Sequence, residues 1–168
     1  MRLRETRQVY ARQDIPIKSR DENRGHVRRI DAAAVTFLNK HLNGPMRLLN
    51  AHLLHLDSEE GICRVRFEIV PAFCHSGGRI CQGGFLTGMV DSAMAHAAIA
   101  RSKLKAAVPT LEIKVSFFEA MGPGVVFAEG RVMRWGGSVG FLDGDLKDEK
   151  GRLIVHATST IKIIYPKK

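Results

Sequence analysis

Cysteines, long apolar runs and targeting signals are all scarce in this chain of 168 residues, and each scarcity narrows the class of protein. The three cysteines, Cys63, Cys74 and Cys81, are an odd number without a paired spacing, so we expect reduced thiols rather than a disulfide framework. No apolar run reaches the ~18 residues of a membrane span, and no apolar core follows the N-terminal charges as in a secretory signal. The sequence therefore predicts a cytoplasmic protein without a membrane partner.

Acidic residues are in deficit, with 17 Asp and Glu against 26 Lys and Arg and a net charge of +9. The excess is concentrated in residues 1–30, which hold eight Arg and one Lys against two Asp and two Glu. Such a segment attracts nucleic acid, an anionic surface or a phosphorylated cofactor, or it is simply a solvated arm. Its one aromatic residue, Tyr10, offers little for base stacking, so we do not expect a nucleic-acid partner. We interpret residues 1–30 as a basic N-terminal extension and residues 31–168 as one domain.

A metal-binding pattern is also missing. His75 lies between Cys74 and Cys81, but a Cys-His-x5-Cys sequence lacks a second ligand pair at the spacing of a zinc site. We therefore predict no metal ion and no cofactor that the protein carries itself.

Hydrophobic periodicity divides the domain into a short helix, two strands, a long helix and four further strands. Asp31 is a candidate N-cap for a helix over residues 31–40, which Asn43-Gly44-Pro45 would end. The expected strands cover residues 46–56, 62–70, 109–119, 125–135, 138–147 and 153–165. Gly136-Gly137 indicates a hairpin, and short turns between the last four strands predict an antiparallel meander.

The long helix, over residues 82–100, is apolar on nearly every side, which is typical of a buried helix. A curved sheet wrapped around it would cover it, giving an α+β architecture of two layers. Asp91 lies in the middle of this helix, and a buried carboxylate is costly without a partner or a purpose. Asp91 is therefore either a functional acid or a structural one that is bonded to Thr87 one turn back or to a loop.

These features resemble the hotdog-fold acyl-CoA thioesterases, in the branch of the phenylacetate-pathway (PaaI-like) enzymes. The motif of that family is His-Gly-Gly followed eight residues later by an acid in a buried helix; here it is Gln82-Gly83-Gly84 and Asp91. The likeness covers residues 31–165, including the run that starts at Thr110 and the ending Gly151 to Thr158. It implies a hotdog fold, with a curved antiparallel sheet around the central helix, and hydrolysis of acyl-CoA to a carboxylic acid and CoA.

The resemblance implies that the backbone N–H of Gly83 stabilises the oxyanion and that Asp91 is the general base or the nucleophile. The physical chemistry agrees, because helix N-terminal amides are unpaired donors and glycine lets a carbonyl approach the backbone closely. Eight helical residues rise ~12 Å, so Gly83 and Asp91 of one chain cannot both reach one thioester carbon. We therefore expect a homodimer with two shared sites, and a dimer of dimers is also compatible with the pattern.

Three further catalytic positions follow from the resemblance. Ser76 occupies the place of an amide side chain that holds the attacking water, although a polar loop residue is an equal reading. Gln82 replaces the usual histidine and can position the loop by hydrogen bonds without acting as an acid or base. Thr110 falls where relatives have a hydroxyl that orients the acid or the water, or it merely opens a strand.

The predicted substrate contacts are Gly84 and Phe85 beside the acyl group and Arg79 and Arg134 beside the phosphates of CoA. The acyl pocket would also include Met89, Phe117 or Trp135, unless these side chains simply pack in the core.

Two alternative functions remain open. One is a hotdog enoyl-thioester hydratase or dehydratase, in which His75 would pair with an acid. The other is a non-catalytic protein that binds acyl-CoA, or that binds nucleic acid through residues 1–30.

Overall fold

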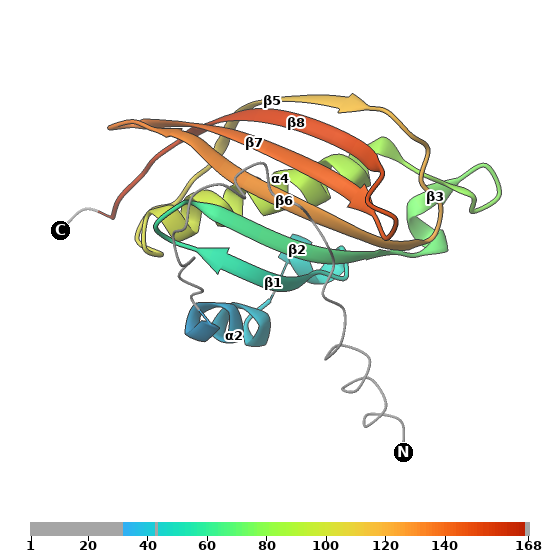
Figure 1. The fold of residues 1–168 in the computed structure, drawn as a ribbon, viewed down its shortest axis with the longest axis horizontal. Helices are drawn as coiled ribbons and strands as arrows, with labels where there is room; N and C mark the ends of the chain where they lie inside the picture. The colour runs from blue at the N-terminus through green and yellow to red at the C-terminus, as the bar shows by residue number, and fades with distance from the viewer. Residues whose placement is uncertain (1–31, 43, 167–168) are drawn as a thin grey trace, which may run out of the picture.

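The computed structural model describes residues 32–42 and 44–166. The basic extension of residues 1–30 and the proposed N-cap Asp31 lie outside the described residues. A six-stranded antiparallel sheet curves around one long helix, α4 (Gly83–Arg101), as Figure 1 shows. The sheet has, in spatial order, β1 (His52–Asp57), β2 (Ile62–Ile69), β6 (Gly124–Trp135), β7 (Val139–Asp148), β8 (Leu153–Lys162) and β5 (Thr110–Phe117). The predicted hotdog architecture is confirmed.

Smaller elements surround this core. They are α2 (Ala32–Lys40), α3 (Gly44–Leu48), a 3₁₀ turn at Pro71–Phe73, and a two-stranded hairpin of β3 (Cys74–His75) and β4 (Ile80–Cys81). The hairpin leads directly into α4, so its position decides where the first turn of α4 lies.

Two of the predicted elements are wrong. The stretch 46–56 is not one strand: α3 occupies its first residues, since Pro45 stands in the first turn of that helix, where a missing N–H costs nothing. The last four strands are not a simple meander either. Strand β5 lies at the far edge of the sheet, where it pairs with β8 rather than with β6, while β6, β7 and β8 lie side by side in chain order. Turn signals fix which strands are antiparallel, but they do not fix the order in which strands lie.

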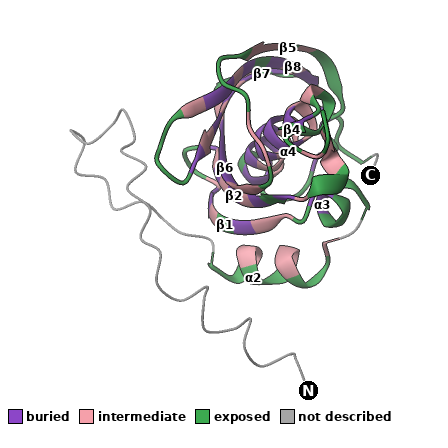
Figure 2. Cartoon of the chain, turned by 90° about the vertical axis from the view of Figure 1, so that its right-hand side faces the viewer, coloured by how far each residue is buried: buried purple, intermediate pink, exposed green. Residues whose placement is uncertain are grey.

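The backbone of α4 rests directly on glycines of the sheet. A Cβ atom on Gly130 of β6 would lie 2.4 Å from the backbone of Ala93 and Met94, and one on Gly144 of β7 would lie 2.8 Å from the Met94 side chain. Gly130 and Gly144 are direct partners across β6 and β7, so they form one shallow seat for the helix. Figure 2 shows α4 enclosed on this inner side and α2 outside β1. The seat fixes the position of the functional helix.

The two edges of the sheet differ. At the β1 edge, the side-chain amide of Asn39 in α2 donates to the backbone oxygen of Leu53 and accepts from its N–H, both at 2.9 Å, so it pairs with the strand as a neighbour would. At the other edge, β5 pairs with β8 and with no second strand of the described residues. Leu111 and Phe117 on β5 are 59% and 52% exposed. Strand β5 is therefore an open edge with apolar side chains.

Replacing Gly130 by Ala should lower the free energy of unfolding by about 3 kcal/mol, because the added methyl group meets helix backbone that has nowhere to move. Chemical denaturation measures the effect. Gly137→Ala is the matched control, since a Cβ at Gly137 meets nothing within 4 Å. Equal unfolding midpoints for the two variants would contradict the proposed seat.

Candidate active site

The first turn of α4 is organised by Gln82, its N-cap residue. The side-chain oxygen of Gln82 accepts a hydrogen bond from the Gly84 N–H at 2.7 Å, and its backbone oxygen accepts one from Phe85 at 3.0 Å. The Gln82 N–H itself donates to the backbone oxygen of Phe73 at 2.9 Å, which ties the cap to the segment before the hairpin. Gln82 therefore works as a helix cap, a role that needs no acid–base chemistry.

Gly83, the first residue of α4, is left with a free amide. Its N–H has no acceptor among the described residues, whereas the next two amides are both satisfied by Gln82. The positive end of the helix dipole adds to the field at this N–H. A Cβ on Gly83 would lie 3.1 Å from the Phe117 ring, and one on Gly84 would lie 2.7 Å from the Gln82 side chain. Close approach by neighbouring side chains, rather than an unusual backbone angle, is what favours glycine at these two positions.

A pocket of about 300 Å³ opens beside Gly83. It is lined by Ile80, Cys81, Gly83, Leu86 and residues 117–121, which follow from the end of β5. The walls are mainly apolar, so a group held there would be partly removed from water. An unpaired N–H at the edge of an apolar pocket is an arrangement that can stabilise negative charge on a carbonyl oxygen.

Asp91 lies two turns further along α4 and is half-buried. Thr110, the first residue of β5, donates a hydrogen bond from its hydroxyl to the Asp91 carboxylate at 3.0 Å. Burial raises the pKa of Asp91 above its ordinary value, and the Thr110 hydrogen bond opposes part of that rise. The alternative partner Thr87 instead donates to the Gly83 backbone oxygen, so Asp91 is not held by the preceding turn.

Strand β5 connects the two groups of residues. Thr110 at its start holds Asp91, and Phe117 at its end lies against Gly83. The two groups are thus at opposite ends of one strand, and one continuous helix also separates them by eight residues, or ~12 Å. Within one chain the amide and the carboxylate do not meet.

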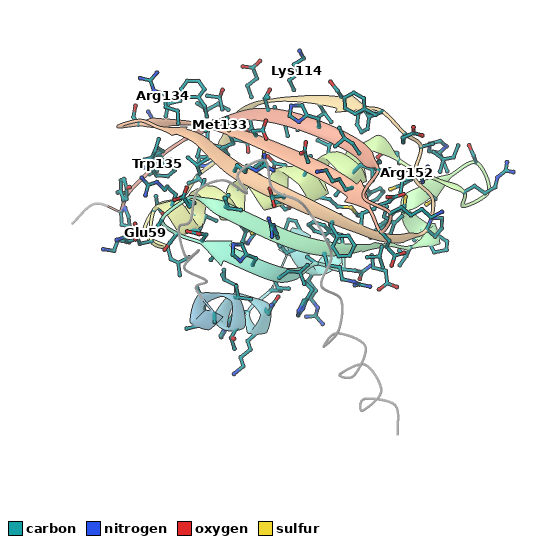
Figure 3. All side chains as sticks on the ribbon, viewed as in Figure 1. Glu59, Lys114, Met133, Arg134, Trp135 and Arg152 are labelled. Atoms are coloured by element: carbon teal, nitrogen blue, oxygen red, sulfur yellow. The ribbon has the colours of Figure 1, made fainter. Side chains whose placement is uncertain are left out.

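The remaining predicted residues lie outside the lining of the pocket. Ser76 stands at the exposed tip of the β3–β4 hairpin with a φ of 54°, and its hydroxyl is 2.8 Å from Nδ1 of His75. Arg79 is close by and donates to the Ser76 backbone oxygen at 3.0 Å. Phe85 stacks on Phe73, with ring centroids 4.5 Å apart. Arg134 is in register, across β7 and β8, with Glu112 near the start of β5. Figure 3 shows Arg134 at the end of the sheet away from the hairpin.

Of the three further side chains that the sequence predicts for the acyl pocket, one lines it. Met89 is fully buried in the core, and Trp135 lies near Arg134 at the far end of the sheet (Figure 3). Phe117 is the one of the three that lines the pocket, together with Cys81 and Met121, which the sequence did not assign to a pocket. The sequence gives little indication that Cys81 and Met121 line a pocket, because this depends on how the hairpin and the 117–121 segment fold back on α4.

Neither a metal centre nor a membrane helix is found in the described part of the chain. No group of three His, Cys, Asp or Glu side chains among the described residues could hold a metal ion. No helix within residues 32–42 and 44–166 is long and apolar enough to cross a membrane.

The fold and the loop-to-helix site together define the class as a hotdog-fold protein. Residues 78–155 match the model of the Thioesterase superfamily. The chain is similar to the structure of the E. coli PaaI protein from the phenylacetic acid degradation operon, with 16% identity, a TM-score of 0.69, and 79% of this chain and 92% of that chain covered.

Two further relatives agree with this class. A phenylacetic acid degradation-related protein from Ralstonia eutropha is 26% identical with a TM-score of 0.68, covering 75% of this chain and 96% of that chain. A predicted esterase from Saccharolobus solfataricus is 26% identical over 121 residues, which are 72% of this chain and 84% of that protein. The resemblance to PaaI-like hotdog thioesterases is confirmed, and the protein is a thioester hydrolase by class.

Replacing Thr110 by Val should raise the pKa of Asp91 further, because the hydroxyl that donates to the charged carboxylate is removed while the burial stays. Carboxyl-carbon NMR titration of the labelled Asp91 measures this shift. Thr110→Ser keeps the hydroxyl and should leave the pKa near that of the parent protein. An equal shift in both variants would show that the hydroxyl does not stabilise the charge.

Proposed function

We propose that the protein hydrolyses acyl-CoA thioesters to a free carboxylic acid and CoA, with the Gly83 N–H polarising the carbonyl and Asp91 of the partner subunit acting as base or nucleophile. The observation that carries this proposal is the unsatisfied Gly83 amide. Gln82 pairs the next two N–H groups of the helix, whereas the Gly83 N–H has no acceptor among the described residues and lies beside an apolar pocket. A thioester carbonyl oxygen that accepts from it gains the most when negative charge develops there.

The acyl group fits the pocket beside Gly83. Leu86 and Phe117 supply apolar walls, and the pocket volume of about 300 Å³ is at the small end of ligand sites. Arg79, on the hairpin next to Ile80, is placed to meet an anionic part of the substrate that extends from the pocket. Arg134 lies at the end of the sheet near Thr110 and Asp91, away from the Gly83 pocket of the same chain. It could therefore contact substrate only in the site to which the Asp91 of its own chain contributes.

The carboxylate must come from a second chain, because the helix and β5 both keep Asp91 away from Gly83 within one chain. Antiparallel pairing of β5 with the β5 of a second copy supplies it. In such a pair the start of one strand lies opposite the end of the other, so the end marked by Thr110 meets the end marked by Phe117. The open apolar edge of β5 supports this arrangement, and the two-fold symmetry gives two equal sites.

Asp91 is suited to the chemical step because its raised pKa makes the carboxylate a stronger base than a solvated one. Thr110 keeps the carboxylate oriented. Attack by Asp91 itself and attack by a water that Asp91 deprotonates use the same geometry. Ser76 stays a proposal as a group that holds such a water. The free thiols fit an enzyme that works in the cytoplasm. The active assembly is a dimer or a dimer of dimers.

The hydratase alternative finds no comparable support. His75, the histidine that it requires, is exposed and bonded to Ser76 on the hairpin.

Replacing Gly83 by Pro removes the N–H and tests its role. Proline is tolerated at the first position of a helix, and Gln82 already has the extended backbone that precedes a proline, with φ −68° and ψ 132°. The matched control is Gly83→Ala, which adds the same Cβ near Phe117 but keeps the N–H. We expect kcat for acyl-CoA hydrolysis, followed by thiol release, to be about 100-fold lower in the Pro variant than in the Ala variant. Equal rates would remove Gly83 as the oxyanion donor.

Mixing two inactive variants tests the shared site. Asp91→Asn and Gly83→Pro homodimers should each be almost inactive, whereas a mixed dimer has one site with both groups intact. If the two chains pair at random in co-expression, about a quarter of the parent activity should return. Purification through two different tags isolates the mixed dimers for measurement. Recovery to no more than the sum of the two homodimers would place the whole site within one chain.

A further inference from the structure

Cys74 and Cys81 lie directly opposite each other on the β3–β4 hairpin. They are Cα partners in this antiparallel pair, and both are free thiols. Cys81 is buried and lines the pocket, while Cys74 is partly exposed. Cys63, the third cysteine, is fully buried on the inner face of β2. The sequence showed an odd number of cysteines without a paired spacing; the fold pairs two of them across the Gly-containing loop between β3 and β4.

The positions suit a disulfide. Opposed residues in an antiparallel pair have Cα atoms ~4.5–5.5 Å apart, inside the range of about 4.4–6.8 Å that disulfides span. The Cβ atoms of such an opposed pair are ~4.5–5.5 Å apart, whereas the two Cβ atoms of a disulfide average ~3.8 Å. Bond formation therefore draws the two hairpin strands together by about an ångström. The resulting strain, together with the exposure of the hairpin, favours a bond that thiols readily reduce.

We propose that Cys74 and Cys81 are a redox modification site that closes to a reversible disulfide beside the candidate active site. The oxidant is a peroxide. The thiolate of Cys74 attacks one peroxide oxygen, the O–O bond breaks, and a sulfenic acid forms. The other oxygen leaves as hydroxide and takes up the proton that the Cys74 thiol lost, which gives a molecule of water. The thiol sulfur of Cys81 then attacks the Cys74 sulfur, the S–O bond breaks, and a second water leaves with the proton of Cys81. Two thiols and one peroxide thus give one disulfide and two waters.

The surroundings of the two thiols assign their roles. Cys74 is the one that an oxidant in solution reaches, because Cys81 is only 4% exposed. Burial, and then the neighbouring Cys74 thiol, raise the pKa of Cys81 to about 11, so Cys81 stays a protonated thiol near neutral pH. Cys81 is therefore not the first thiol to react with the oxidant. Because it lies directly opposite Cys74, it is the resolving thiol, and its proton passes to the departing oxygen as its sulfur attacks. Burial also raises the pKa of Cys63, which has no cysteine partner across its strand pairs.

The disulfide changes the pocket because the hairpin holds both its wall and the cap of α4. The Cys81 N–H donates to the Met121 backbone oxygen at 2.7 Å, and both residues line the pocket. The next residue, Gln82, donates to Phe73 and caps the N–H groups of Gly84 and Phe85, beside the free N–H of Gly83. Contraction of the hairpin by about an ångström shifts these groups relative to the pocket, and misplacement of that size costs up to about 100-fold in rate. This second half of the inference rests on the proposed function; the formation of the disulfide does not.

The test treats the full-length protein with a few equivalents of hydrogen peroxide and counts thiols after denaturation. We expect the count to fall from three to one per chain, the intact mass to fall by two hydrogen atoms, and a peptide that links Cys74 to Cys81. Dithiothreitol should restore all three thiols. Cys74→Ser and Cys81→Ser should each lose this product, so that no single-variant folding defect decides the result. Oxygen added at Cys74 without loss of the Cys81 thiol, or a bridge to Cys63, would overturn the proposal.

Activity is measured on the same samples. Oxidation should lower kcat/KM for acyl-CoA hydrolysis about tenfold in the parent protein and leave Cys74→Ser unaffected, with recovery on reduction. A disulfide that forms without any change in rate would overturn the proposed effect of oxidation on the active site, but not the proposed formation of the disulfide. A reduced protein that hydrolyses no acyl-CoA while the disulfide still forms would instead contradict the proposed function.

Discussion

The contact between the backbone of α4 and the paired glycines of β6 and β7 is the constraint on which the rest of the structure depends. A helix can approach a sheet this closely only where the sheet has no side chains, and Gly130 and Gly144 provide that place. The curved sheet then closes over the helix on both sides, with Met94 and Val90 packed against Gly144. The N-terminus of α4 and the mid-helix acid are fixed together, because both belong to one rigid element. The distance between the candidate amide and the candidate carboxylate is therefore set by helix geometry rather than by loops.

Asp91 illustrates what such an enclosed position costs. The carboxyl group has a raised pKa because its charged form is partly removed from water, and Thr110 compensates only in part. A carboxyl pKa that is higher in the folded than in the unfolded protein means that the folded state binds the proton more tightly. The contribution of Asp91 to stability is then most favourable at pH values below its unfolded pKa and declines as the pH rises through its folded pKa. At neutral pH this residue weakens the fold, a cost that agrees with the reactive role proposed for it.

The sequence predicted the parts of the fold that depend on local patterns. Alternation identified β2, where Cys63, Val65, Phe67 and Ile69 are all buried, and the apolar helix was identified with Asp91 inside it. It did not predict the far-edge position of β5, because strand order depends on contacts between segments distant in the chain. The same limit applies to the site. The Gly-Gly pair and the acid could be found by spacing, but the Phe117 ring over Gly83 and the Cys74–Cys81 pair arise from tertiary packing. Gln82 was expected to position the loop, and its hydrogen bonds define that as helix capping.

The pairing of Asn39 with Leu53 has a consequence for assembly. A sheet with two free edges can add copies of itself without end and form a filament, whereas a sheet with one free edge stops after a single self-complementary addition. The side-chain amide of Asn39 occupies both backbone groups of Leu53 and so denies β1 to an incoming strand at that point. One short polar side chain thereby leaves β5 as the edge of the described sheet that is open to a further strand, which is the condition for growth that stops rather than continues into a fibre.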